Sequence, residues 1–465
     1  MVLYFWRIFF LDRRTPKRGY LVSLPVSLYD ELYQQKLTTP AKAVECIADQ
    51  SNLIMGMGVG MPPALMQAVG DRARAGDFTR LNVYYMHGHN DILTTIFTPE
   101  NMPYIKPHPL FMSHADRALA KMGNDRGEEW IHFVPCLFHQ AGRLMTEAIS
   151  PDAHIVTVSP MDKSGYFSLG TSPDYSATVI RKAKHVIVEV NENMPRTFGE
   201  SLVHISDVNN VVEHTTPLME TIIGGSSELD EVIGKIVADQ VPDGATIQMG
   251  IGGVPNATMR LLEEKNDLGL HSELFSPPMV RLIKKGVLNG RNKALLPYKH
   301  VFTLALGDRD MFDFMDNNPS IVGYPVCWVN NPSIIRQNNN LVSVNAAIEV
   351  DLSGQVNSEA ISGHQFSGTG GQLDFVRGAY ASEGGKSFIA LHSTAKKGTL
   401  SRIVPKLLGG AVTDPRMDVM NVVTEYGMAE LKGKSLQQRA AALIEISHPD
   451  FRDDLRAEAK KANLL

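Results

Sequence analysis

Two stretches of the chain share one local pattern: an apolar run of strand length, a glycine turn, and a proline near the start of a helix. Residues 53–66 read L-I-M-G-M-G-V-G-M-P-P-A-L-M, and residues 246–259 read T-I-Q-M-G-I-G-G-V-P-N-A-T-M. Glycine permits a tight turn, and the fixed φ of proline suits the first helical turn. Ordinary strand–turn–helix units also use these residues, so chance similarity stays open. Two related α/β halves are the more economical interpretation.

The rest of the chain alternates strand and helix patterns. Strands are expected at residues 82–85, 132–134, 153–159, 166–169, 185–190, 301–305, 341–351, 387–391 and 421–424, and helices at residues 115–122, 228–240, 279–285, 403–408 and 435–445. A turn at residues 162–165 predicts a hairpin between residues 153–159 and 166–169. Alternation of this kind indicates an α/β fold with two similar domains and mostly parallel sheets.

Three segments are expected along the chain. Residues 26–220 form an N-terminal α/β domain and residues 221–465 a C-terminal one, because the pattern breaks at 214–227, where a serine can cap the next helix. Residues 1–25 form an N-terminal extension that we expect to be poorly ordered. Its apolar run is short and precedes its basic cluster, unlike a secretory signal or a spanning helix. Attachment to a membrane surface is the alternative for this extension.

Composition excludes several classes of protein. The 465-residue chain has 43% hydrophobic residues, a formal net charge of −5 and a pI near 6.3, so nucleic acid is not an expected partner. Its three cysteines form no C-x-x-C pair, which argues against disulfides or zinc and fits a reducing cytoplasm. His87, His89, His132 and His139 lack a third metal ligand at helical spacing, so no metal is expected. We expect a cytoplasmic protein without a membrane span.

The second glycine turn is the first candidate for a site. Gly250, Gly252 and Gly253 precede a helix, and a helix N-terminus attracts anions. Glu273 follows the helix stop at Gly269, and would be either a nucleophile in a ligand site or a solvated strand residue. The full dinucleotide fingerprint, the phosphate loop and the G-x-S-x-G elbow are all absent.

A later glycine loop is the second candidate. Residues 367–371 read S-G-T-G-G, and adjacent glycines can direct consecutive backbone N–H groups at one oxygen, as an oxyanion hole requires. From the residues alone, a plain irregular loop is the simpler interpretation.

Taken together, the motifs of the second half resemble those of one enzyme family. The matching blocks are G-I-G-G-V-P from 250, G-L-H-S-E from 269, V-D-L-S-G-Q-V-N-S-E from 350, S-G-T-G-G-Q-L-D-F-V-R-G from 367, S-T-A-K-K-G-T from 393 and V-T-E-Y-G-M-A-E-L-K-G from 423. This order resembles the acetyl-CoA hydrolase/transferase family of class I CoA-transferases, and within it the 4-hydroxybutyrate CoA-transferase branch. The resemblance implies a class I CoA-transferase-like fold.

The resemblance also implies roles for individual residues. Glu273 matches the nucleophile that attacks the acyl-CoA thioester, Gly371 and Asn331 match the backbone and side-chain donors of an oxyanion hole, and Glu425 matches a second acidic residue of the site. The positions that match the CoA-binding residues are Gly250, Ile251, Gly252, Gly253, Val254, Gly370, Gly371 and Lys396.

The implied reaction moves CoA from a short acyl-CoA, such as acetyl-, butyryl- or succinyl-CoA, to a small carboxylic acid. It runs by a ping-pong mechanism through a glutamyl-CoA thioester, with CoA as substrate and no permanently bound cofactor, in a homodimer or homotetramer. After Glu273 the branch usually has F-S-D-G-V-V-D-L, whereas this chain has F-S-P-P-M-V-R-L. The basic Arg281 suggests a dicarboxylate acceptor such as itaconate or succinate, unless Arg281 faces solvent. An acyl-CoA hydrolase and a catalytically dead CoA-binding protein are the alternatives.

Overall fold

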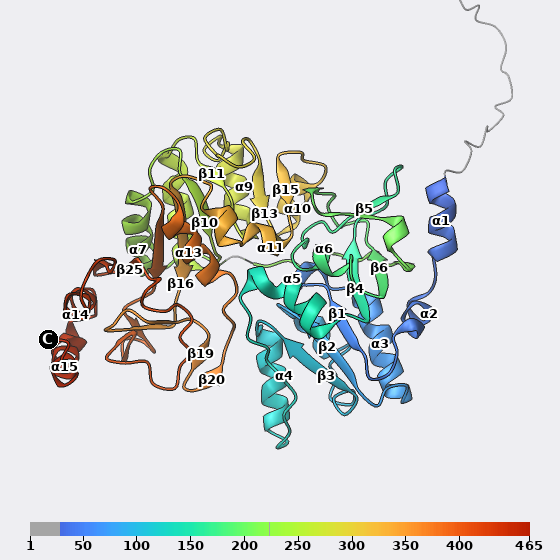
Figure 1. Cartoon of the computed structure of the whole chain (residues 1–465), viewed down its shortest axis with the longest axis horizontal. Helices are drawn as coiled ribbons and strands as arrows, with labels where there is room; N and C mark the ends of the chain where they lie inside the picture. Colours follow the sequence, from blue (N-terminus) through green and yellow to red (C-terminus); the bar gives the residue numbers. More distant parts are fainter. Residues whose placement is uncertain (1–27, 223) are drawn as a thin grey trace, which may run out of the picture.

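The computed structural model describes residues 28–222 and 224–465, and the predicted extension at residues 1–25 lies outside them. Two sheets of six strands dominate the described chain, one in each half (Figure 1). Helices pack on both, so the predicted fold class, two α/β halves with mostly parallel sheets, is confirmed. The boundary predicted near residue 220 stays a prediction, and the two sheets lie on opposite sides of it.

The sheet of the first half is entirely parallel. Its strands, in spatial order, are β3 (Ile105–Pro109), β2 (Leu81–Tyr85), β1 (Asn52–Met55), β4 (Ala153–Val158), β6 (His185–Val190) and β9 (Asn210–Glu213). All six residues of β4 are buried, as expected for a central strand of a covered parallel sheet. The order in which strands are added to the sheet reverses between β1 and β4, and such switch points are where α/β proteins bind ligands.

The sheet of the second half also has six strands, and all of them are parallel except the edge strand β26 (Gly427–Glu430), which is antiparallel to β25 (Asn421–Thr424). Its strands, in spatial order, are β11 (Gly269–Leu270), β10 (Thr246–Met249), β16 (Leu341–Ala346), β21 (Lys386–Ala390), β25 and β26. Covering helices include α7 (Glu228–Asp239), which Ser227 caps as predicted, and α14 (Leu436–Glu445), which Ser435 caps. The switch point lies between β10 and β16.

The repeated turns fold alike but differ in where their helices begin. In the first half a 3₁₀ turn at Gly58–Gly60 separates β1 from α3 (Pro63–Ala75). In the second half α8 (Gly253–Leu261) begins directly after Gly252, whose φ of 134° requires glycine. The second turn is therefore shorter and brings a helix N-terminus closer to the end of its strand.

Shared backbone pairing and a shared core join the two halves. β7 (Phe198–Gly199) of the first half pairs with β15 (Ile321–Gly323) of the second. The amide N–H of Ala305 donates to the carbonyl of Thr171 at 2.8 Å. The largest cluster of buried apolar side chains contains residues of both halves, among them Phe138 and Phe275. The interface between the halves is therefore built like a protein interior.

Three local predictions are wrong. The turn at 162–165 and the strand after it, β5 (Tyr166–Ser168), form as predicted, and the N–H of Ser159 donates to the carbonyl of Ser168 at 2.9 Å. The expected pairing of this strand with β4 is wrong: β5 pairs with β8 (Leu202–His204), because β1 and β6 already occupy both edges of β4. Residues 403–404 form strand β24 rather than a helix, since Pro405 disfavours helical backbone before it. Residues 132–134 form no strand, although two of their N–H groups bond to carbonyls of β3.

The described residues contain no group of three or more histidine, cysteine or acidic side chains placed to hold a metal ion. Within residues 28–222 and 224–465, no helix has the length and apolar character needed to cross a membrane.

Candidate active site

Glu273 stands between two short strands at the junction of the halves. It follows β11 and precedes β12 (Leu274–Phe275), which pairs with β14 (Leu304–Ala305). The backbone carbonyl of Glu273 accepts hydrogen bonds from the N–H groups of Thr303, at 3.1 Å, and Leu304, at 3.0 Å. These two hydrogen bonds hold the backbone of Glu273 in place.

Two donors contact the carboxylate of Glu273. The side-chain amide of Asn330 donates to Oε2 at 2.6 Å, and the backbone N–H of Gly371 also bonds to the carboxylate. A Cβ atom added to Gly371 would overlap Oε2 of Glu273 and Nδ2 of Asn330. Glycine is therefore required at 371 by the closeness of its backbone to the carboxylate.

The prediction that Asn331 supplies the amide donor is wrong by one residue. Asn331 is the N-cap of the short helix α12 (Pro332–Ile335), and its side chain accepts from the N–H of Ser333 at 2.9 Å. Asn330 ends the preceding helix α11 (Val326–Val329), is fully buried, and faces Glu273. Two adjacent asparagines thus divide the tasks of capping a helix and contacting the carboxylate.

A cavity of about 250 Å³ opens beside Glu273. Its walls include His87 and Phe111 from the first half and, from the second, Gln248, Gly250, Ile251, Glu273, Leu304, Asn345 and residues 367–372. It lies at the carboxyl ends of β10 and β16, at the switch point of the second sheet. The described residues that line it include no lysine or arginine.

The predicted CoA-binding turn contributes to this cavity only in part. Gly250 and Ile251 line it, and Gly370 and Gly371 line it from the other glycine loop. Gly252 and Gly253 lie at the start of α8, where a Cβ on Gly253 would overlap the Asp230 carboxylate. Val254 is a buried core residue of α8. These three positions shape the turn rather than face the cavity.

Burial gives Glu273 an unusual proton affinity. The pKa of Glu273 is raised from 4.5 to about 7; burial is the largest cause and the nearby Asp374 carboxylate adds to it, while the bonds from Asn330 and Gly371 oppose the rise. A raised pKa inside a cavity with converging donors is typical of functional carboxyl groups.

Two other predicted site residues lie elsewhere. Lys396 is exposed in the hairpin of β22 (Thr394–Ala395) and β23 (Leu400–Ser401), with a φ of 48°. Both oxygens of Glu425 accept hydrogen bonds from Ser393, at 2.9 Å from its N–H and 2.5 Å from its hydroxyl. Neither residue lines the Glu273 cavity, so Glu425 anchors the start of the Lys396 hairpin instead of forming a second acidic group beside Glu273.

Arg281 also lies away from the cavity. It belongs to α9 (Pro277–Lys284), and its Nε forms a 2.7 Å ion pair with Glu263. The reason for predicting a dicarboxylate acceptor from Arg281 is therefore wrong, because the side chain is engaged outside the Glu273 cavity.

The acidic neighbour of Glu273 and the histidine of its cavity were both missed as site residues. Asp374 is 1% exposed and lies in the first turn of α13 (Gln372–Ala381), three residues after Gly371. His87 has a φ of 47°, stacks on Phe111 with ring centroids 4.3 Å apart, and lines the cavity. A non-glycine residue at positive φ often marks a functional site, but sequence alone does not reveal it.

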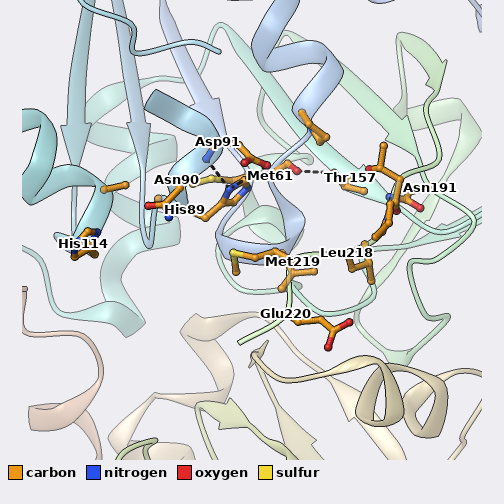
Figure 2. Close-up of a pocket in the computed structure, with 16 residues that line it drawn as sticks. Met61, His89, Asn90, Asp91, His114, Thr157, Asn191, Leu218, Met219 and Glu220 are labelled. Carbon is orange, nitrogen blue, oxygen red and sulfur yellow. Dashed lines mark hydrogen bonds and ion pairs between the residues drawn. The ribbon is translucent and has the colours of Figure 1, made fainter. Parts of the chain in front are cut away.

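A larger cavity of about 470 Å³ lies at the carboxyl ends of β1, β2 and β4 in the first half. Figure 2 shows His89 and His114 on one side of it, Thr157 and Asn191 on the other, and residues 218–220 along its edge. It is the counterpart, in the first repeat, of the Glu273 cavity. None of the predicted site residues lines it.

Two parts of the chain match models of one protein family. Residues 25–222 match the acetyl-CoA hydrolase/transferase N-terminal domain, and residues 307–459 match the C-terminal domain of the same family. The chain belongs to the acetyl-CoA hydrolase/transferase family. The glycine turn at 250 and Glu273 lie between the two matched ranges.

Relatives in this family match almost the whole chain. The chain is 42% identical to the 4-hydroxybutyrate coenzyme A transferase of Clostridium kluyveri, over 93% of this chain and 99% of that protein. It is 41% identical to the succinyl-CoA:cyclohexane-1-carboxylate CoA transferase of Geobacter metallireducens, over 94% and 98%. The crystal structure of RipA from Yersinia pestis is 47% identical, covers 94% of this chain and 100% of that chain, and superimposes with a TM-score of 0.91.

Proposed function

We propose that this chain is a CoA-transferase that moves CoA from a short acyl-CoA, such as acetyl-, butyryl- or succinyl-CoA, to a small carboxylic acid. The observation that carries the proposal is the Glu273 carboxylate, which faces a cavity and accepts hydrogen bonds from the Asn330 amide and the Gly371 N–H. The CoA-transferase names of the relatives described above support it. The predicted homodimer or homotetramer stays a prediction.

The first half-reaction would begin with attack by Glu273. Its carboxylate oxygen adds to the thioester carbonyl, and the C–S bond breaks to give an acyl-glutamyl anhydride and CoA thiolate. The thiolate then attacks the glutamyl carbonyl, which releases the donor acid as a carboxylate and leaves a glutamyl-CoA thioester. The acceptor carboxylate reverses these steps and leaves as the new acyl-CoA, so no cofactor is consumed and the kinetics are ping-pong.

The donors on Glu273 suit the steps at the glutamyl carbonyl. When thiolate or carboxylate attacks that carbon, negative charge collects on the glutamyl carbonyl oxygen, and Asn330 and Gly371 already donate to the carboxylate group that supplies this oxygen. Preorganised donors of this kind stabilise the developing charge without moving. Glu273 must be ionised to attack first, so the fraction of active enzyme should rise as pH passes about 7.

The cavity wall favours a short acceptor with a polar group at its far end. Neutral polar side chains, His87, Gln248 and Asn345, line it beside apolar ones such as Phe111 and Leu304. Burial lowers the pKa of His87 to about 4, so its ring is neutral at physiological pH and offers a hydrogen bond rather than a charge. We therefore propose a 4-hydroxybutyrate-like acid as acceptor, and we keep a dicarboxylate such as itaconate as the less favoured alternative, because no lysine or arginine among the described residues lines the cavity to balance its second charge.

An acceptor panel tests this function. Purified protein is incubated with one acyl-CoA donor alone and then with 4-hydroxybutyrate, itaconate, succinate or butyrate, while new acyl-CoA and free CoA are measured separately. We expect new acyl-CoA to form only with an acceptor, and more of it with polar-ended acids than with butyrate. Release of free CoA without any acceptor would instead indicate a hydrolase, and no turnover with any pair would indicate a CoA-binding protein.

A further inference from the structure

One segment of the first half reaches across to the glycine loop beside Glu273. It is the 3₁₀ helix η4 (Phe138–Gln140), which leads directly into α5 (Ala141–Arg143), the helix labelled between the two halves in Figure 1. The N–H of Phe138 donates to the carbonyl of Gly370 at 3.0 Å. The same segment packs against α11, the helix that ends at Asn330. It therefore contacts the supports of both groups that bond to the Glu273 carboxylate.

The next residue of η4 holds a buried carboxylate by two bonds. The N–H of His139 donates to Oδ2 of Asp374 at 3.0 Å, and its Nδ1 lies 2.6 Å from Oδ1. A carboxylate only accepts hydrogen bonds, so Nδ1 must carry the proton. Asp374 is 1% exposed, whereas the His139 side chain is 23% exposed. The Asp374 carboxylate is therefore buried, and the histidine of the first half that contacts it, His139, is partly exposed to solvent.

Asp374 is electrostatically close to Glu273. Burial is the main cause of the raised pKa of Glu273, and the negative charge of Asp374 adds to it. Asp374 also lies in the first turn of α13, whose N-cap is Gly371, so its position and that of the Gly371 N–H are linked by one helical turn. Any shift of Asp374 would therefore move both the charge and the donor that act on Glu273.

We propose that His139 and Asp374 form a positioning pair that couples the first half of the chain to the geometry and ionisation of Glu273. The inference deepens the proposed function and rests on it for its catalytic meaning. His139 holds Asp374, and with it the Gly370–Gly371 loop, in a fixed position relative to Glu273. The Nδ1–H of its imidazole, which His139→Ala removes while the backbone N–H stays, offsets part of the negative charge that Asp374 exerts on Glu273.

The sign of the electrostatic effect follows from the groups that face Asp374. They are Glu273, His139 and the thiol of Cys136, and burial raises the pKa of Cys136 to about 12, so the thiol is neutral. Replacing Asp374 by asparagine removes a negative charge, which makes Glu273 ionise at lower pH. Removing His139 leaves the negative charge of Asp374 less compensated, which makes Glu273 ionise at higher pH. The two variants should therefore shift the pKa of Glu273 in opposite directions.

The test measures the pH at which Glu273 ionises and does not depend on catalytic turnover. Glu273 of the full chain is labelled by a water-soluble carbodiimide and an amine over a series of pH values, and the label is quantified by mass spectrometry. Because labelling requires the protonated carboxyl, its pH midpoint reports ionisation. We expect the midpoint to fall by roughly half a pH unit or more in Asp374→Asn and to rise by a similar amount in His139→Ala. His139→Asn, which keeps a hydrogen-bond donor, should lie between His139→Ala and the unmodified protein.

A matched pair elsewhere provides the control. Nδ1 of His214 contacts the buried Glu189 carboxylate at 2.9 Å, in the first half and away from the Glu273 cavity. His214→Asn should leave the Glu273 midpoint unchanged. Midpoints that stay the same, or that move in the same direction, in folded Asp374→Asn and His139→Ala would overturn the proposal. If the unmodified protein fails to transfer CoA, the proposed function fails, while the labelling result still decides the pairing.

Discussion

The side-chain amide of Asn330 donates a 2.6 Å hydrogen bond to Oε2 of Glu273, while the adjacent Asn331 turns away and caps a helix. The two residues share a chemical type and differ by one position, yet only one contacts the carboxylate. This contrast supplies a matched pair of substitutions for the central residue of the site.

Asn330→Ala should lower kcat/KM by roughly 10²–10³-fold, because it removes one preorganised donor from the glutamyl oxygen. Asn331→Ala should instead cost about 1 kcal/mol of folding stability through loss of the helix cap, with near-normal turnover. Steady-state kinetics and thermal denaturation of both variants check this. The reverse order of effects would show that Asn331 is the functional donor after all.

Gly371→Ala should abolish most activity in a protein that still folds. The new methyl group would overlap the Glu273 carboxylate and the Asn330 amide, so the carboxylate must leave its position between the donors. We expect a loss of at least about 10²-fold in kcat, as for removal of an oxyanion donor. A variant that keeps more than half of the parent kcat would mean that this loop does not approach Glu273 during turnover.

Gly250→Ala tests whether glycine is needed at this position for folding or for binding CoA. No described atom lies within 4 Å of a Cβ at this position, and Gly250 has no positive φ that would demand glycine. The variant should therefore keep its Tm. If CoA contacts this turn, as the resemblance predicts, the methyl group should weaken CoA binding by about tenfold or more, measured by calorimetry. Unchanged CoA affinity would place the ligand elsewhere.

Glu273→Gln should stabilise the protein in a pH-dependent way. The pKa of Glu273 is raised from 4.5 to about 7 in the folded state, so the stability associated with its protonated form is present below 4.5 and lost as pH rises through 7. Glutamine avoids a buried charge at every pH. The Tm of the variant should thus exceed that of the parent above pH 7, and the difference should shrink toward pH 4.5. A constant difference across this range would contradict the raised pKa.

Much of the fold followed from local patterns. The turn at residues 250–253 and the repeated turn at 56–62 predicted two parallel sheets, because glycine and proline fix strand-to-helix turns through short-range sterics. The helix predicted at 403–408 failed because Pro405 and pairing with a distant strand outweighed local apolar spacing. Strand pairing is non-local: the turn at 162–165 forms as predicted, but the strand after it pairs with the distant β8 instead of β4.

The site was predictable where contacts are made by backbone and less so where they depend on side-chain direction. Glu273 and Gly371 do meet, as their motifs suggested. Asn330 and Asn331 cannot be told apart by type or spacing, and only the helix break between α11 and α12 decides which one faces inward. Asp374 became a site residue through a contact with His139, 235 positions away in the chain, which no local pattern encodes.

The most direct measurement concerns the bond that Glu273 is proposed to form. The protein is incubated with an acyl-CoA, treated with borohydride and digested, and the peptide that contains Glu273 is analysed by mass spectrometry. We expect Glu273 to be reduced to the corresponding alcohol only after incubation with acyl-CoA, because borohydride reduces a thioester and not a free carboxylate. A fully active protein whose Glu273 stays unmodified, or a Glu273→Gln variant that turns over normally, would contradict it.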